Sequence, residues 1–393
     1  MLGKGYLEIG YGKRSKGGGF DVGAGAASDA IAMLARHAPS VMIVYASVAQ
    51  ELPEVLRGIR SVAPSAPLIG ATTAGEIANG VARAGVVVTV LASPDLAVRY
   101  AAARRVSADW RGTTDDVLRS PDLAPVLACG PEQLQEFRRA GVSHFGMLFS
   151  PGNTRACSSY SYEILEHIKS CTLGRLPWIG GSTADDWHMD GNAVLADRHV
   201  YDDGLLLAVF ETRLRFGIAM SHGFKAEDAR ATVTSVEDHE VLELDGRPAA
   251  DVVAEMLELD RPALSARHIT LTTRRTFGAA DSLGQYSINV ATYMTARGGV
   301  RFTQPLPVGA KLTLMNPSDR GFSEAGPDAI LKAMIRGRIP EPAVAIVHYC
   351  ALRERLNSDG ARHGPRPAWP SRSAPAPPPG RPAASTPRRD RRP

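Results

Sequence analysis

An internal repeat is the feature that most restricts how this chain can fold. The first copy, residues 41–76, runs from an apolar segment through an amphipathic helical stretch to a second apolar segment and a turn. The second copy, residues 144–186, has the same order, and an apolar run follows each copy. A strand, a crossover helix and a second strand normally pair in parallel through a right-handed connection. The repeat therefore predicts two β-α-β units.

The strand-like runs of both copies are almost continuously apolar, which is typical of a mostly parallel sheet covered on both faces. We therefore expect an α/β domain at residues 21–250, preceded by an extension at 1–20. From residue 251 to 356, short strand-like runs between Gly and Pro turns predict a smaller mixed α+β domain. Residues 357–393 are rich in Pro, Ala, Arg and Ser, cannot bury enough apolar surface to fold, and are predicted to be a disordered tail.

Charge and composition exclude several function classes. The net charge is +4, but residues 361–393 hold eight Arg and one Asp, so the rest of the chain carries about −3. No basic surface for nucleic acid is therefore expected on the folded part. No apolar run approaches the roughly 20 residues of a membrane-spanning helix, and the N-terminus lacks a secretory apolar segment. The four cysteines form no Cys-x-x-Cys pair, so neither a zinc ribbon nor a disulfide scaffold is indicated. We expect a cytoplasmic protein with no metal.

Polar residues follow the predicted strands of both copies. In parallel sheets, ligands tend to bind beyond the carboxyl ends of the strands. The candidate ligand-binding residues at these ends are Ser47, Thr72, Thr73, Glu76, Ser150, Ser182, Thr183, Asp185 and Asp186. Their hydroxyl and carboxylate groups could bind the amino group of a ligand. The same residue types also satisfy free backbone amides at turns and helix starts, so both interpretations stay open.

Several motifs in a fixed order resemble the FIST family of sensory proteins from about residue 20 to 356. They include 69–76 (IGATTAGE), 180–186 (GGSTADD), 221–224 (SHGF), 243–249 (ELDGRPA) and 350–353 (CALR). The resemblance implies a FIST N-terminal domain and a FIST C-terminal domain. It also implies a non-enzymatic function, the binding of a small amino-acid-like ligand, and signalling to a partner. Because the sequence contains no kinase, cyclase or coiled-coil segment, that partner would be a separate protein such as a histidine kinase or another effector.

The sequence departs from the family pattern near its C-terminus. Family members usually continue past the segment at 350–353 with a further helix and a strand that ends in an aromatic, Gly-rich turn. Here the Pro/Arg-rich segment stands in that place. We therefore expect a truncated C-terminal domain.

A second functional hypothesis concerns haem. Some FIST proteins resemble nitric-oxide sensors that hold haem through a histidine, and this resemblance makes His222 the candidate axial ligand. A neutral imidazole can bind haem iron and leave the opposite face for a diatomic gas. In the alternative interpretation, His222 bonds the backbone at a strand end beside Gly223.

A third hypothesis is an enzyme that uses the turn containing Asp185 and Asp186. Adjacent carboxylates in a turn commonly face solvent, and the segment at 150–153 is not a Gly-x-Ser-x-Gly nucleophile elbow. The prediction therefore remains a non-enzymatic sensor, with haem as the one cofactor under consideration.

Overall fold

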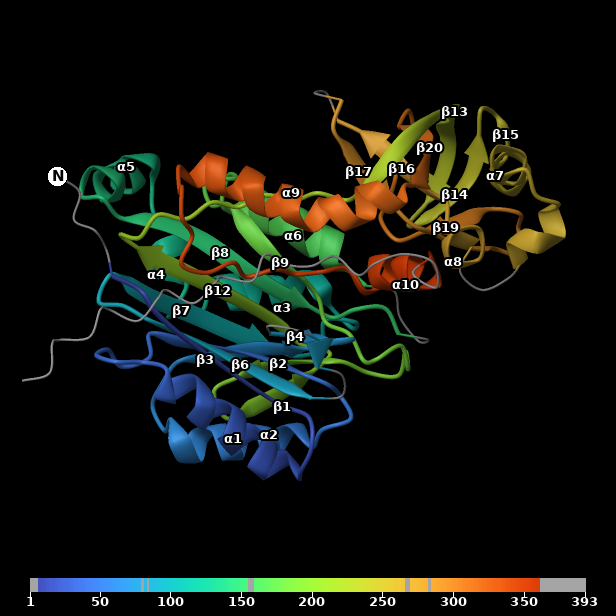
Figure 1. The fold of residues 1–393 in the computed structure, drawn as a ribbon. Coiled ribbons are helices and arrows are strands. Elements are labelled where there is room, and N and C mark those ends of the chain that lie inside the picture. The colour runs from blue at the N-terminus through green and yellow to red at the C-terminus, as the bar shows by residue number, and fades with distance from the viewer. Residues whose placement is uncertain are drawn as a thin grey trace, which may run out of the picture.

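The computed structural model describes residues 6–78, 81–82, 85–154, 159–265, 269–281 and 284–360. Of the predicted tail, residues 361–393 lie outside this described part, and the last described element is the helix α10 (Ala351–Gly360). Two layered sheets form one body of the protein, and a third sheet forms a second body beside it (Figure 1).

The first copy of the repeat lies in a six-stranded sheet. Its strands, in spatial order, are β1 (Glu8–Arg14), β6 (Val86–Ala92), β2 (Val41–Ala46), β3 (Leu68–Thr72), β10 (Ala193–Ala196) and β11 (His199–Asp202). β2 and β3 are joined by α2 (Leu52–Val62) and pair in parallel. The other neighbouring strands of this sheet pair antiparallel. Residues 8–14, which the sequence analysis assigned to an extension, form a strand of this sheet.

The second copy lies in a separate four-stranded sheet. Its strands, in spatial order, are β7 (Leu96–Ala103), β12 (Leu205–Thr212), β8 (Ser143–Ser150) and β9 (Trp178–Ser182). β8 and β9 are joined by α6 (Ser161–Cys171) and pair in parallel, whereas β12 pairs antiparallel with both of its neighbours.

The α/β class and both predicted β-α-β units are confirmed, but the structure corrects the expectation of one mostly parallel sheet. Each copy contributes a single parallel pair, and the two pairs belong to different sheets. The strands are apolar on both faces because each sheet packs against helices on one face and against the other sheet on the opposite face. Such burial produces the same apolar runs whichever direction the neighbouring strands take.

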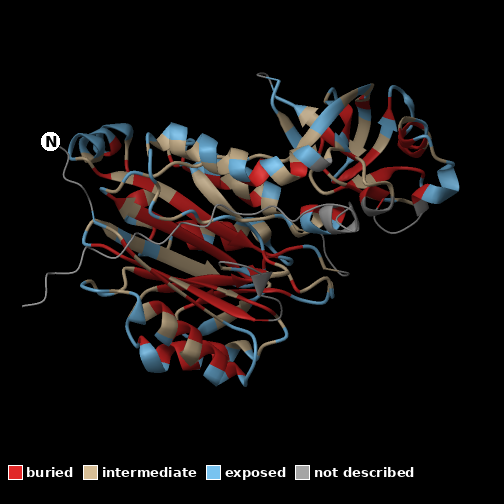
Figure 2. Ribbon diagram, in the orientation of Figure 1, coloured by how far each residue is buried: buried red, intermediate tan, exposed pale blue. Residues whose placement is uncertain are grey.

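Side chains alternate between the two faces of each strand, as strand geometry requires. In β12, Leu206, Ala208 and Phe210 point into the core between the two sheets. Leu205 and Leu207 point to the outer face. The buried strands of both sheets are visible in Figure 2.

Helices cover the two outer faces. α1 (Gly19–Ala32) and α2 pack on the first sheet through Val22, Val55 and Ile59. The approach of these two helices requires glycine, because a Cβ on Gly23 would lie 2.1 Å from the carbonyl oxygen of Val55. α3 (Trp110–Leu118) and α6 pack on the second sheet. The order of layers is therefore helices, sheet, sheet, helices. Two short helices, α4 (Ala124–Leu127) and α5 (Pro131–Arg139), follow α3, and β4 (Glu76–Ile77) pairs with β5 (Val81–Ala82).

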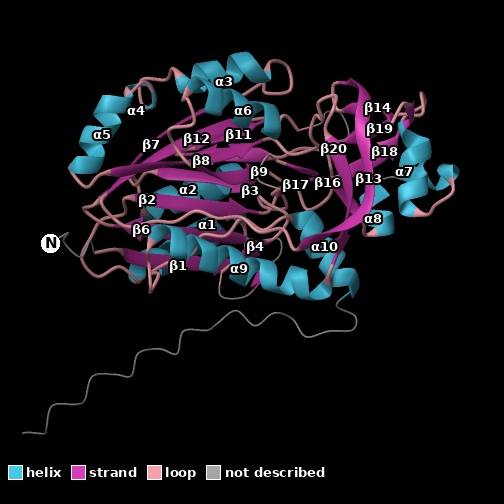
Figure 3. Cartoon of the chain, turned by 90° about the horizontal axis from the view of Figure 1, so that it is seen from above, coloured by secondary structure: helices cyan, strands magenta, loops and turns pink. Residues whose placement is uncertain are grey.

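The second body contains an eight-stranded sheet with its own apolar core (Figure 3). Its strands are β13 (Phe224–Glu237), β14 (Glu240–Leu244), β15 (Arg247–Pro248), β16 (Thr276–Ala280), β17 (Tyr286–Asn289), β18 (Ala291–Met294), β19 (Val300–Phe302) and β20 (Lys311–Pro317). Its helical elements are α7 (Ala249–Leu257), η1 (Arg261–Ser265) and α8 (Ile269–Thr273). The sheet begins at β13, before the change of pattern that the sequence shows at residue 251.

The chain returns to the first body after the last strand. α9 (Asp319–Gly337) runs back from β20, and a non-helical segment follows it. In that segment Val344 and Ile346 pack against the core between the two sheets. His348 Nε2 lies 2.6 Å from the hydroxyl of Tyr45 on β2. None of the helices in the described part of the chain is both long and apolar enough to cross a bilayer.

Candidate functional site

The carboxyl ends of the two repeated units meet, although they belong to different sheets. Ser47 follows β2, and its Oγ donates a hydrogen bond of 2.5 Å to Oδ2 of Asp186, in the turn after β9. The backbone N–H of Ala184 donates to the carbonyl oxygen of Thr72 at 3.0 Å. The two turns in which the sequence placed most of the candidate residues therefore contact one another.

A cavity of about 490 Å³ adjoins this contact. It is lined by Val48, Leu52, Thr72, Val106, Ser107, Pro151, Gly152, Thr154, Tyr160, Asp190, Gly191, Asn192, Ala193, Asp202 and Asp203. Its volume is within the range of small-molecule sites, about 300–1,000 Å³. The lining combines apolar side chains with hydroxyl, amide and carboxylate groups, which is the usual composition of a site that orients a small ligand.

Three of the predicted residues shape the wall of this cavity. Thr72 lines it directly, and its Oγ1 accepts the N–H of Ala193 at 3.0 Å. Asp185 is 4% exposed, and its Oδ2 accepts the N–H groups of Asp190 and Gly191 at 2.8 and 3.1 Å. This carboxylate therefore holds the loop that supplies the lining residues 190–192.

Thr183 joins the same loop to the segment after β8. Its buried Oγ1 donates to Oδ1 of Asn192 and accepts the N–H of Gly152 at 3.3 Å. Gly152 leaves no room for a side chain, because a Cβ there would lie 2.1 Å from the carbonyl oxygen of Thr183.

Ser150 and Ser182 lie at the ends of β8 and β9, where they bond the first residue of α6. Ser161 Oγ is 2.7 Å from Ser150 Oγ and 2.6 Å from Ser182 Oγ. Ser150 is fully buried, whereas Ser182 is exposed. Neither lines the cavity, and both fix the start of the helix that follows Tyr160.

The half-buried Thr73 and the buried Glu76 form a hydrogen-bonded pair in the first copy. Thr73 Oγ1 donates to Glu76 Oε1 at 2.7 Å, and the N–H of Gly85 donates to Oε2 at 3.1 Å. Burial raises the pKa of the Glu76 carboxyl above its ordinary value because it disfavours the charged form, and the nearby negative charge of Asp186 acts in the same direction. The pair closes the turn and does not line the cavity.

His222 lies at the start of the second body, away from the cavity described above. Its Nδ1 accepts the N–H of Phe224 at 3.0 Å, as the backbone-bonding interpretation expected. Burial lowers the pKa of His222, and the positive charges of Arg353 and Lys332 lower it further. In the neutral ring that accepts at Nδ1, the proton is on Nε2, so that nitrogen has no lone pair for iron. This arrangement does not fit haem ligation.

Most residues that line the cavity were not predicted from the sequence. Val106 and Ser107 follow β7, and Asp202 and Asp203 lie at the turn before β12. The Asp-Asp-Gly run at 202–204 was the available signal, because it places two carboxylates immediately before a buried strand. Nothing in the sequence linked that turn to the repeated motifs.

Comparison with known protein families gives a match over the region that holds the cavity. A family model described as the FIST N domain matches residues 40–247, which is more than half of the chain. The chain belongs to the FIST family. FIST domains form a sensory and signal-transduction family. The matched region of this FIST protein contains both β-α-β units and the cavity, and it ends before the predicted C-terminal domain at 251–356, which stays a prediction.

Individual proteins also show similarity to this FIST protein. An uncharacterized protein of Methanocaldococcus jannaschii is 38% identical over 88 residues, which are 22% of this chain and 17% of that protein. The chain thus spans less than a fifth of that relative. Cyanuric acid hydrolase from A. caulinodans is 11% identical, with a TM-score of 0.27 over 54% of this chain and 73% of the hydrolase.

Proposed function

We propose that this FIST protein is a cytoplasmic, non-enzymatic sensor that binds a small amino-acid-like metabolite in the cavity of about 490 Å³. The observation that carries the proposal is the position of the cavity, where the turns of both repeats meet. Its lining offers separate groups for the two charges of an amino acid.

Carboxylates provide the attraction for an amino group. Asp190 and Asp202 line the cavity and are exposed, and Asp203 lies beside Asp202. Asp203 is already engaged, since it accepts the N–H of Ser107. The described lining contains no Lys or Arg. A ligand that presents an ammonium group would therefore meet negative charge at this wall.

The N-terminus of α2 provides the attraction for a carboxylate. Val48 and Leu52, which flank the start of this helix, line the cavity. The N-cap residue Glu51 makes no side-chain cap, and Glu54 already places one carboxylate in the first turn. The first N–H groups of a helix and its dipole favour an anion at that end. Thr72 and Asn192 also line the cavity and offer further hydrogen-bonding groups.

Signalling requires the ligand to bind two conformations unequally. The cavity lies where the two sheets are joined by the bond between Ser47 and Asp186, so a ligand there would bias the relative position of the two repeats. We propose that a separate protein, a histidine kinase or another effector, reads this change.

The enzyme hypothesis gains no support from the Asp185/Asp186 turn. Asp185 accepts two backbone N–H groups, and Asp186 accepts the hydroxyl of Ser47. Both carboxylates therefore have structural partners.

A thermal-shift screen of the full chain against the common amino acids tests the proposal. Matched amines and carboxylic acids that lack the second charge should stabilise less than the amino acid that binds. At a concentration 100 times Kd, a bound ligand should add about 2.7 kcal/mol to the free energy of unfolding. Asp190→Asn and Asp202→Asn should each weaken this effect, whereas Asp228→Asn on the exposed face of β13 should not. Stabilisation by no compound, or equal stabilisation of all variants, would reject the proposed ligand class.

A further inference from the structure

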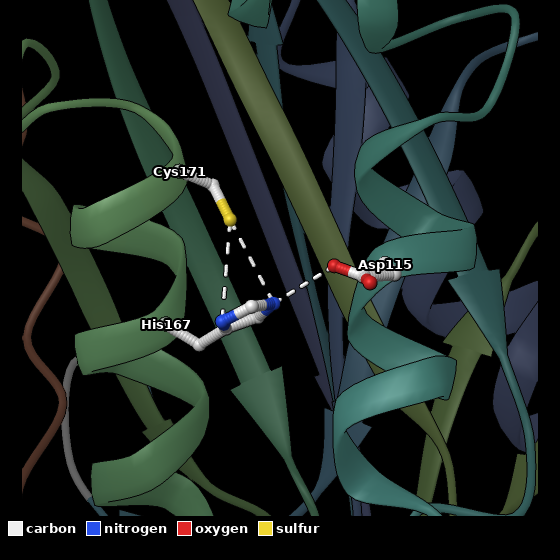
Figure 4. Close-up of side chains that lie close together, drawn as sticks. All are labelled: Asp115, His167 and Cys171. Atoms are coloured by element: carbon white, nitrogen blue, oxygen red, sulfur yellow. Dashed lines mark hydrogen bonds and ion pairs between the residues drawn. The ribbon is translucent and has the colours of Figure 1, made fainter.

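Three side chains with different metal-binding atoms gather on the outer helical layer, outside the cavity. His167 and Cys171 lie one turn apart on α6, and Asp115 faces them from α3 (Figure 4). Residues four positions apart on a helix share a face, which brings the imidazole and the thiol together. α3 and α6 pack together on the outer face of the second sheet, and this packing brings the carboxylate of Asp115 to the imidazole and the thiol.

The distances are close to those of a metal site. Oδ1 of Asp115 accepts a hydrogen bond of 2.8 Å from Nε2 of His167, and Sγ of Cys171 lies 3.7 Å from the same nitrogen. A metal ion would take the place of the proton on Nε2, and the neutral ring would then carry its proton on Nδ1. The three ligand atoms all lie within 4.8 Å of one another. Bond lengths of about 2.0–2.3 Å in a tetrahedral zinc site place neighbouring ligand atoms roughly 3.3–3.8 Å apart. The Asp115 oxygen lies closer to Nε2 than these values, so the carboxylate would have to move away from the imidazole to admit the ion.

We propose that Asp115, His167 and Cys171 form a zinc-binding site. Sulfur, imidazole nitrogen and carboxylate oxygen are the three atoms that zinc binds in proteins, whereas calcium and magnesium select oxygen alone. A thiolate and a carboxylate together neutralise the charge of a divalent ion. The three donors leave a fourth position for water, on the side where Cys171 is exposed.

Neighbouring groups orient two of the three ligands. Trp110 and the His167 ring are in T-shaped contact, with centroids 6.0 Å apart and planes at 83°. Arg119 Nη2 lies 3.2 Å from Oδ2 of Asp115, which leaves Oδ1 directed at the imidazole. Outer contacts of this kind fix the orientation of metal ligands and are part of a working site.

The site would connect two helices that cover the second sheet. Tyr160, which precedes α6 and lines the cavity, stacks on Trp110 with centroids 6.2 Å apart. A bound ion would therefore fix α3 and α6 beside one wall of the cavity. The proposal does not depend on the identity of the ligand in that cavity.

Cobalt and zinc titrations of the full chain, reduced and freed of metal with a chelator, test the site. Co²⁺ reports a tetrahedral site by its visible absorption and reports a bound thiolate by a sulfur-to-cobalt charge-transfer band. Competition against a chromophoric chelator then measures the Kd for Zn²⁺. The variants are Cys171→Ser, His167→Gln and Asp115→Asn. Cys350→Ser is the matched control, since it removes another exposed thiol.

We expect one Co²⁺ per chain with a charge-transfer band that disappears in Cys171→Ser and persists in Cys350→Ser. Zinc affinity should fall at least 10–100-fold in the three site variants. Removing a residue that only contacts a metal ligand already costs about that much. Melting temperatures without metal should stay near that of the parent, which separates ligand loss from unfolding. Absence of the charge-transfer band in the parent would overturn the proposal. Equal zinc affinity in the parent and in Cys171→Ser or His167→Gln would do the same.

Discussion

Ser47 Oγ donates a hydrogen bond of 2.5 Å to Asp186 Oδ2, across 139 residues of sequence. Ser47 follows the first strand of the first repeat, and Asp186 follows the last strand of the second. The same serine oxygen accepts the N–H of Ala49 at 3.0 Å. One buried hydroxyl therefore closes its own turn and joins the two sheets of the sandwich.

Ser47→Ala should lower the free energy of unfolding by about 1–3 kcal/mol, because it removes a buried hydroxyl that bonds the half-buried Asp186 carboxylate and the Ala49 amide. Chemical denaturation measures the change. Ser61→Ala, which removes an exposed hydroxyl from α2, should shift stability by no more than about 0.5 kcal/mol. Equal effects of the two substitutions would show that the bond between the sheets contributes little.

Gly152→Ala should distort the cavity wall. The added Cβ would lie 2.1 Å from the carbonyl oxygen of Thr183, and backbone must move to admit it, at a cost of about 1–3 kcal/mol. Gly191→Ala is the control in the same lining, because its Cβ would meet no atom within 4 Å. Denaturation midpoints of the two variants are compared with that of the parent. A Gly152→Ala protein as stable as the parent would contradict the close contact between Gly152 and Thr183.

Stability should fall in mild acid because of His348. Burial beside Tyr45 lowers the pKa of His348 from 6.5 to about 4. Below pH 6.5 the unfolded chain binds a proton at His348 that the folded chain does not bind. The stability that depends on a neutral His348 is therefore fully present above pH 6.5 and is lost as the pH falls toward 4. The total loss is up to roughly 3 kcal/mol.

His348→Gln should therefore lose about 2 kcal/mol less than the parent between pH 7.5 and pH 5. Urea denaturation at the two pH values gives the comparison. His199→Gln, which changes an exposed residue of β11, should follow the parent. A parent-like pH dependence in His348→Gln would show that His348 is not the group responsible.

Hemin should bind without a specific contribution from His222. Because Nδ1 accepts the N–H of Phe224, the neutral ring carries its proton on Nε2. An absorption titration of the parent beside His222→Ala should give the same weak, non-stoichiometric spectrum for both proteins. A stoichiometric Soret band that the substitution removes, and that shifts when nitric oxide is added to the reduced form, would restore the haem hypothesis.

The candidate site was predictable in part. The sequence placed Thr72, Thr183 and Asp185 at strand ends, and the structure places them in the cavity wall or directly behind it. Strand ends can be predicted because apolar runs and turn residues are local signals. The lining residues Val106 and Asp202 come from other elements, and their proximity depends on packing between the two sheets.

By itself, the sequence determined the α/β class and the two β-α-β units, because both follow from short-range apolar patterns and from the geometry of a crossover helix. The tertiary structure alone decided that the two units lie in different sheets with antiparallel neighbours. A strand buried on both faces has the same apolar pattern in either direction, so β6 beside β2 and β12 beside β8 could not be derived from it. The meeting of Asp115 with His167, 52 residues apart, likewise arises only when α3 packs against α6.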